Sequence, residues 1–178
     1  IAIKIAPFNR YQTFDVIRAV AEAGRADEIA LYSGNNDHIV LDLLTQWQVI
    51  TAAGGVDLRF AGGLLGHWAC WTRSAAALLA ECLAVRRQAC IPAGLLTLAE
   101  QITDCNAAFF DAAHQFAGCI AGIHQVLHRQ GLLANILCLD PDEALSPGQA
   151  EEIERVHQAY PHLNDDDFVR AHLDEWLR

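Results

Sequence analysis

The chain lacks methionine altogether and contains a single lysine, Lys4, although eleven arginines supply the rest of its positive charge. Lysine and arginine carry the same charge, but only lysine can lose its proton near neutral pH and attack a carbonyl carbon. Lys4 lies inside the apolar run from Ile1 to Ala6. Two interpretations follow: a reactive amine, or a surface ammonium that extends from the end of a strand.

Several classes of protein are disfavoured by what the composition lacks. The net charge of −10 provides no basic footprint for nucleic acid. No uncharged apolar run is long enough to span a bilayer. The six cysteines include no C-x-x-C pair, which favours reduced thiols in a cytoplasmic protein over a disulfide framework or a zinc site. We therefore expect a cytoplasmic protein with neither nucleic acid nor a membrane as partner.

The chain also lacks an initiator methionine and opens within an apolar, β-branched segment. This predicts the C-terminal part of a longer protein, or a processed one, whose core is shared with residues outside the chain. The same pattern of apolar runs and turn residues predicts alternating strands and helices in the first ninety residues. The strands are expected at 1–6, 28–32 and 58–61, and the helices at 13–23, 37–46 and 67–85, with an irregular stretch over 47–56.

This alternation predicts parallel strands joined by right-handed crossovers, as in a doubly wound sheet or a (β/α)₈ barrel. No clear strand follows Ile91. Helices are expected at 92–116, 120–130 and 146–160, and from Asn164 onward. The predicted domains are therefore residues 1–90, which form the β/α units, and residues 91–178, which form a helical extension.

In both candidate folds the functional loops follow the carboxyl ends of the strands. Here these loops are 7–12, 33–37 and 62–67, and all three are rich in polar residues or glycine. A lysine near such a strand end suits Schiff-base chemistry, and we expect Ile3 and Ile5 to disfavour its ammonium form. The alternative for Lys4 is an ion pair with a carboxylate on a neighbouring strand.

The other loop residues have both functional and structural interpretations. Arg10 could bind a substrate carboxylate through two hydrogen bonds, or form a salt bridge at the rim of the barrel. Gly34 and Asn35 could recognise an anion or a hydroxyl group, or serve as turn residues that cap the next helix. The glycines around Gly63 could allow a ligand or a packed helix to approach the backbone. They match no nucleotide-binding motif. His67 could titrate near the site, but a histidine at the start of a helix is more often structural.

We predict neither a metal site nor a cofactor. His124 and His128 share a helix face, but the residue after His124 is not the glutamate that a metalloprotease motif requires. The carboxylates of residues 165–167 are better explained as favourable charges at the start of a helix.

Taken in order, the motifs resemble a known family. Ile3-Lys4 on a strand, Ser-Gly-Asn-Asn at 33–36 and Gly-Gly-Leu-Leu-Gly at 62–66 are similar to the last three β/α units of the dihydrodipicolinate synthase and N-acetylneuraminate lyase family. The segments 121–132, 139–141 and 145–147 are similar to that family's late helix, Pro-containing connection and final helix. The likeness is to a divergent branch with the phrases Ile-Lys-Ile-Ala-Pro-Phe-Asn-Arg-Tyr and Pro-His-Leu-Asn-Asp-Asp.

The resemblance implies the C-terminal portion, about strands six to eight, of a TIM barrel followed by a helical extension. It implies that Lys4 forms the imine, that Gly34 is the strand-seven glycine near the substrate, and that Gly63 belongs to the strand-eight rim. Ala-Pro-Phe-Asn-Arg follows Lys4 at 6–10, where the family usually has Glu-Ala. The family's tyrosine proton relay and carboxylate-binding loop would lie upstream of this chain.

We therefore expect a class I aldolase or lyase that acts on a 2-oxo acid such as pyruvate, in a homo-oligomer, with this fragment inactive alone. The predicted catalytic residue is Lys4, and the predicted substrate-binding residues are Asn9, Arg10, Gly34, Asn35 and Gly63. One alternative is a non-catalytic barrel that binds a small acid as a sensor or scaffold. Another is a half barrel that pairs with itself to cover its sheet edges.

Overall fold

The computed structural model describes residues 1–64 and 67–178. The chain is a mixed α/β protein that divides by contacts into two compact units. One unit comprises Ile1–Leu65 with Leu78–Glu100, and the other comprises Gly66–Ala77 with Gln101–Arg178. The division does not coincide with the predicted boundary at residue 90, because helices α3 (Thr72–Val85) and α4 (Gly94–Phe109) each contribute to both units.

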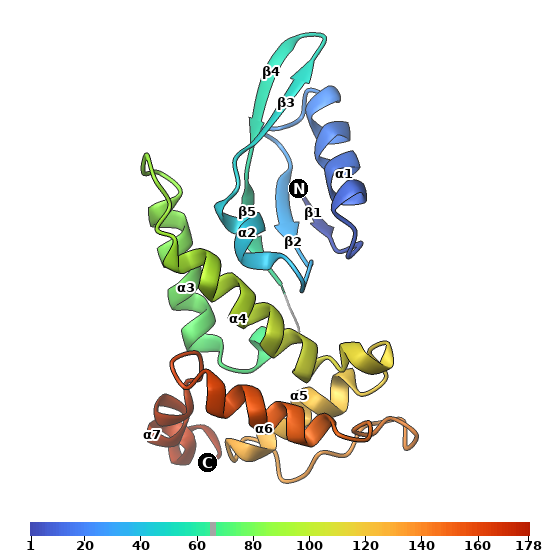
Figure 1. Cartoon of the computed structure of the whole chain (residues 1–178), viewed down its shortest axis with the longest axis vertical. Coiled ribbons are helices and arrows are strands. Elements are labelled where there is room, and N and C mark those ends of the chain that lie inside the picture. The colour runs from blue at the N-terminus through green and yellow to red at the C-terminus, as the bar shows by residue number, and fades with distance from the viewer. Residues whose placement is uncertain (65–66) are drawn as a thin grey trace. The chain divides into compact units, whose positions relative to one another are not determined.

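The first unit is built on a parallel sheet of three strands in the order β1-β2-β5 (Figure 1). The strands are β1 (Ala2–Ile5), β2 (Ala30–Ser33) and β5 (Phe60–Gly63), and the helices after the first two are α1 (Arg10–Glu22) and α2 (Ile39–Leu44). The predicted alternation of parallel strands and helices is confirmed. The third strand begins two residues later than predicted, because Leu58 ends a separate strand.

Helix α1 begins earlier than predicted because its cap is Asn9 rather than Thr13. The Asn9 side chain accepts hydrogen bonds from the backbone N–H groups of Tyr11 and Gln12, at 3.0 and 3.4 Å. Thr13 instead lies on the buried face of the helix. Asn9 therefore satisfies backbone donors that have no partner within the helix.

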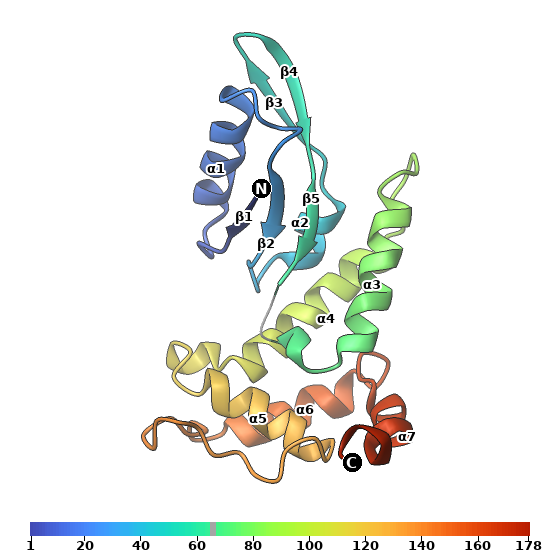
Figure 2. The same ribbon diagram turned by 180° about the vertical axis from the view of Figure 1, so that it is seen from behind.

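An antiparallel hairpin occupies the stretch that we predicted to be irregular, and that prediction is wrong. Strands β3 (Trp47–Thr51) and β4 (Gly54–Leu58) pair with Trp47 opposite Leu58. Figures 1 and 2 show the hairpin extending beyond the parallel sheet, with α1 alongside. Its inner side is anchored by Trp47, whose ring centroid lies 5.9 Å from that of Phe14 and 6.4 Å from that of Phe60.

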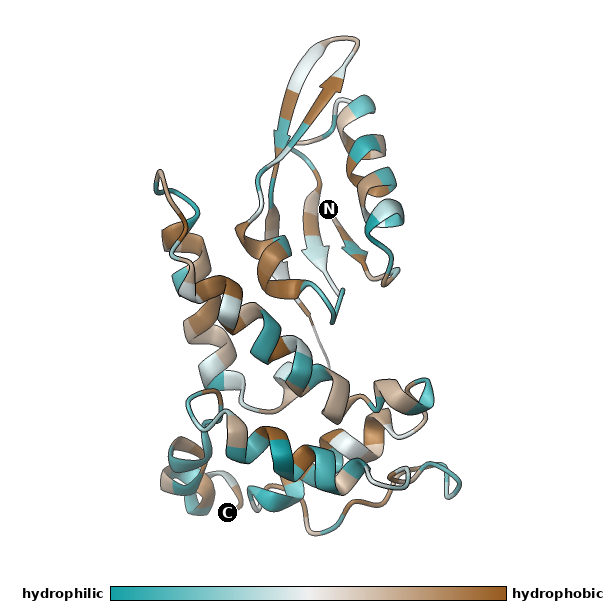
Figure 3. Cartoon of the chain, viewed as in Figure 1, coloured by the Kyte–Doolittle hydropathy of each residue, from teal (hydrophilic) through white to brown (hydrophobic). Residues whose placement is uncertain are grey.

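The two faces of the parallel sheet differ in burial. Ile5, Leu31 and Phe60 are almost inaccessible to solvent and point toward the helices, where α2 is almost uniformly hydrophobic (Figure 3). Because side chains alternate along a strand, Lys4 and Tyr32 point to the opposite face. On that face Lys4 is exposed and Tyr32 is half-buried.

The second unit is helical. Besides parts of α3 and α4 it contains η1 (His67–Ala69), η2 (Ala112–His114), α5 (Cys119–Arg129), α6 (Gln149–Ala159) and α7 (Asp166–Trp176). The predicted helix over 67–85 is interrupted at Trp71, which has a left-handed backbone with a φ of 53°. The predicted helix over 92–116 ends at Phe109, and Asp111, Gln115 and Phe116 are left-handed.

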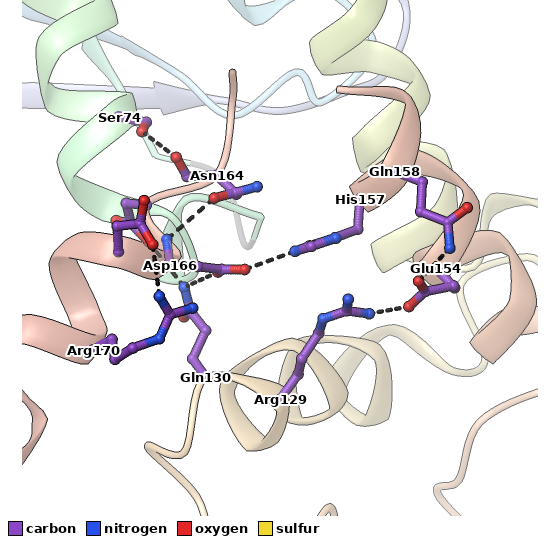
Figure 4. A network of polar contacts seen from close by, with 11 residues as sticks. Ser74, Arg129, Gln130, Glu154, His157, Gln158, Asn164, Asp166 and Arg170 are labelled. Atoms are coloured by element: carbon purple, nitrogen blue, oxygen red, sulfur yellow. Dashed lines mark hydrogen bonds and ion pairs between the residues drawn. The ribbon is translucent and has the colours of Figure 1, made fainter. Parts of the chain in front are cut away.

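Polar contacts between segments distant in sequence stabilise this helical unit. The Asp111 carboxylate accepts hydrogen bonds from the Ser146 hydroxyl at 2.5 Å and from the Gly118 backbone N–H at 3.0 Å. Figure 4 shows a second network, in which His157 and Asp166 pair at 2.7 Å and Gln130 donates to Asp166 at 2.9 Å. These contacts fix the starts of α6 and α7.

All six cysteines are free thiols, and three of them are buried. Burial raises the pKa of Cys70 and Cys105 to about 12 and that of Cys82 to about 11, so these thiols are protonated at neutral pH. Among the described residues, no helix combines the length and apolar character needed to cross a bilayer.

Candidate functional site

Lys4 lies one residue before the carboxyl end of β1, in register with Tyr32 of β2. The expectation that Ile3 and Ile5 would enclose its amine is wrong, because neighbouring residues of a strand point to opposite faces. Ile3 lies on the helix side, where it lines a groove with Val16 and Val20 of α1. The apolar residues beside Lys4 in sequence are thus not beside it in space.

Gly34 is the residue over which the Lys4 side chain lies. A Cβ atom built on Gly34 would come within 2.6 Å of Cε of Lys4 and 2.8 Å of Cβ of Ala6. Both distances are shorter than van der Waals contact, so a larger residue at Gly34 would displace Lys4 or the backbone. Of the predicted substrate-binding residues, Gly34 is the one that the structure brings into contact with Lys4.

A buried polar cluster lies on the other face of the sheet, around the carboxylate of Asp42 in α2. The Asp42 side chain has no exposed area, and its Oδ2 atom accepts hydrogen bonds from the Ser33 hydroxyl at 2.6 Å and from the Asn35 amide at 3.0 Å. Arg10 donates to the same carboxylate, and its guanidinium lies 4.4 Å from the centre of the Trp47 ring. This cluster, which we call the Asp42 cluster, joins α1, β2 and α2.

Arg10 and Asn35 therefore have structural partners on the helix side of the sheet. The Asn35 amide also donates to Thr13 of α1 at 3.2 Å, while its Oδ1 atom is buried without a hydrogen-bond partner. The rim salt bridge considered for Arg10 is present, with Asp42 as the partner. The contacts of both residues hold the strand ends together. Substrate binding by either residue stays a prediction.

Asn9 and Gly63 also have structural explanations. Asn9 is exposed and caps α1 through its side-chain oxygen. A Cβ atom on Gly63 would meet Cδ1 of Ile39 at 2.5 Å, so this glycine allows α2 to pack closely on β5. Gly62 points to the opposite face, where its missing Cβ makes room for the Tyr32 ring. Leu65 and Gly66, at the end of the predicted loop, lie outside the described residues.

The histidines considered in the sequence are accounted for by contacts in the helical unit. Burial lowers the pKa of His67 to about 4, and its Nδ1 lies 2.7 Å from Oδ1 of Asn106. His124 has Sγ of Cys138 at 3.8 Å, and His128 contacts the carbonyl oxygen of Leu133. The part of the chain that the structure describes contains no group of three or more metal-ligating side chains.

Tyr32 is the residue that sequence reasoning overlooked. The alternation of side chains along β2 could have placed it on the face of Lys4, but its register with Lys4 depends on how the strands pair.

No protein-family model matches the chain, and no curated protein sequence matches it either. The motifs, the strand order and the geometry of this face are therefore the features from which a function can be inferred.

Proposed function

We propose that residues 1–90 form the last three β/α units of a (β/α)₈ barrel, and that the barrel is a class I aldolase or lyase. Its substrate would be a 2-oxo acid such as pyruvate. The parallel strands and their crossovers support the barrel, since both are features of that fold. In a complete barrel, the face opposite the helices is the interior, and the remaining strands would enclose Lys4 there.

One observation carries this proposal: the only lysine lies on the sheet face opposite α1 and α2, at the carboxyl end of its strand, above a glycine. Active sites of barrel enzymes form at the carboxyl ends of the strands. Lys4 is exposed within this chain, so its amine is accessible to a carbonyl compound. The Asp42 cluster supports the same site from the helix side, because it fixes the loop that carries Gly34.

The chemistry needs no bound cofactor. The amine of Lys4 would attack C2 of the 2-oxo acid, and loss of water from the resulting carbinolamine would give an imine. The protonated imine accepts the electron pair that is left when a bond to C3 breaks. Cleavage of a carbon–carbon bond at C3 would release an aldehyde, and the reverse reaction would form that bond.

Borohydride reduction of the full-length protein in the presence of pyruvate tests the proposal. We expect the intact mass to increase by one reduced pyruvate adduct, and Lys4→Arg to abolish this increase because a guanidinium forms no imine. Absence of an adduct on the unmodified protein would reject the mechanism. Saturable pyruvate binding without an adduct, unchanged in Lys4→Arg, would instead indicate the non-catalytic barrel.

A further inference from the structure

Three arginines of the first unit gather at the amino end of β5. Arg59 directly precedes β5, and Arg86 and Arg87 directly follow α3. The guanidinium of Arg86 donates from Nη1 to the carbonyl oxygen of Phe60, the residue after Arg59, at 2.7 Å. Burial lowers the pKa of Arg86, and repulsion by Arg59 and Arg87 lowers it further. We call these three residues the Arg86 cluster.

No carboxylate of the described chain neutralises this cluster directly. Within residues 1–64 and 67–178, none of its three arginines forms an ion pair. Arg59 donates to the side-chain oxygen of Gln46, whose amide donates to Asp57 at 2.6 Å, so this carboxylate is one side chain away. Unpaired positive charge is therefore concentrated here, although the chain as a whole has a net charge of −10.

The ends of two helices offset part of the positive charge. Arg86 also donates to the carbonyl oxygen of Leu43, in the last turn of α2, at 3.4 Å, and α3 ends at Val85. A helix C-terminus favours cations because its backbone carries about half a negative charge. Two such ends supply at most about one negative charge against three positive ones. A bound anion would complete the balance.

The donors that remain in the cluster suit a phosphate group. A guanidinium has five N–H donors in one plane, and they match phosphate oxygens two at a time. Arg86 uses Nη1 for both carbonyl contacts and Arg59 uses Nη2 for Gln46, so each retains further donors. Arg87 is exposed. A phosphate monoester carries about 1.5 to 2 negative charges near pH 7, so it neutralises such a cluster better than a carboxylate does.

We propose that the Arg86 cluster binds the phosphate or diphosphate group of a small molecule. The strands of the sheet are parallel, and Arg59 lies at their amino ends whereas Lys4 lies near their carboxyl ends. The phosphate site is therefore separate from Lys4, and this inference does not depend on the proposed function. The ligand is a small molecule because the net charge of −10 disfavours a long polyanion such as nucleic acid.

Thermal denaturation of the full-length protein in pyrophosphate tests the inference. Sodium chloride at the same pH and ionic strength is the reference, because it screens surface charges to the same extent. We expect pyrophosphate to raise the melting temperature saturably above this reference, since a ligand that binds the folded state stabilises it. Isothermal titration calorimetry then gives the Kd. A melting temperature no higher in pyrophosphate than in sodium chloride would overturn the inference.

The variant Arg87→Gln shows whether the cluster is the binding site. Arg87 is exposed, so its replacement should leave the fold intact, and loss of a charge-assisted hydrogen bond should raise the Kd by about tenfold or more. Arg59→Gln should have an effect of similar size. The matched control is Arg18→Gln, which removes the same charge from the exposed surface of α1 and should change the Kd by less than about twofold. An equal loss of affinity in Arg87→Gln and Arg18→Gln would also overturn the inference.

Discussion

On one face of the parallel sheet Leu31 and Phe60 are inaccessible to solvent, whereas on the other face Lys4 is exposed and Tyr32 is half-buried. Parallel sheets are normally covered on both faces. The helix side has the features of a core: close apolar packing and a carboxylate whose hydrogen bonds are provided within the chain. The open side has an amine, a phenol and two glycines that leave room for them. The helix side therefore stabilises the fold, and we propose that the other face binds the ligand.

The largest expected effect on stability is at Asp42. Asp42→Ala would leave Arg10, Ser33 and Asn35 without their common acceptor. Ser33 and Asn35 are buried, and each buried donor left unsatisfied costs about 1–3 kcal/mol. Chemical denaturation of the variant measures the loss, with Asp15→Ala on the exposed surface of α1 as control. A loss at Asp42 no larger than that of the control would show that the cluster does not stabilise the unit.

Substitutions at the adjacent glycines of β5 compare the packing of the two faces directly. Gly63→Ala places a methyl group against Ile39 in the packed core, and overpacking of this kind costs about 1–3 kcal/mol. Gly62→Ala meets the half-buried ring of Tyr32 rather than a buried side chain of the core, so its cost in the free energy of unfolding should be smaller. Equal thermal destabilisation by the two substitutions would mean that both faces are packed alike.

The substitution Asn9→Ala tests whether Asn9, in the loop after β1, stabilises α1 or binds the substrate. Removing the helix cap in Asn9→Ala should cost about 1 kcal/mol in the free energy of unfolding. The half-saturating pyruvate concentration in borohydride trapping should not change. If it rose severalfold, Asn9 would contact the substrate, as the sequence suggested.

The smallest effect on stability is expected at Lys4 itself. Lys4 is exposed and forms no ion pair with a residue that the structure describes, so Lys4→Arg should change the free energy of unfolding by no more than about 0.5 kcal/mol. Its effect on chemistry should nevertheless be complete, because the amine is lost. Substantial unfolding of Lys4→Arg would indicate that the lysine has a structural role.

The sequence revealed the parallel strands because each is a short apolar run that ends at turn residues. It did not reveal the β3–β4 hairpin, whose turn at Thr51–Gly54 lacks the Asn-Gly or Asp-Gly pair that marks tight hairpins. The end of α4 was also missed. Asp111 adopts a left-handed backbone there and accepts hydrogen bonds from Ser146 and Gly118, and such partners become adjacent only after folding.

The candidate site was predictable only in part, because some of its contacts join residues that are distant in the sequence. Lys4 is conspicuous by its chemical type, and Gly34 by its place after a strand. Arg10 and Asn35 lie on the helix side of the sheet because both bind Asp42 of α2, and no sequence pattern links Asp42 to them. The position of Tyr32 beside Lys4 required the register between β1 and β2.

We propose that the Lys4 amine condenses with a 2-oxo acid on the face of the sheet opposite α1 and α2. Peptide mapping by mass spectrometry, after borohydride reduction of the full-length protein with pyruvate, measures this most directly. We predict that the reduced pyruvate adduct lies on the peptide that contains Lys4 and that it is absent from Lys4→Arg. An adduct on any other peptide, or none at all, would contradict the claim.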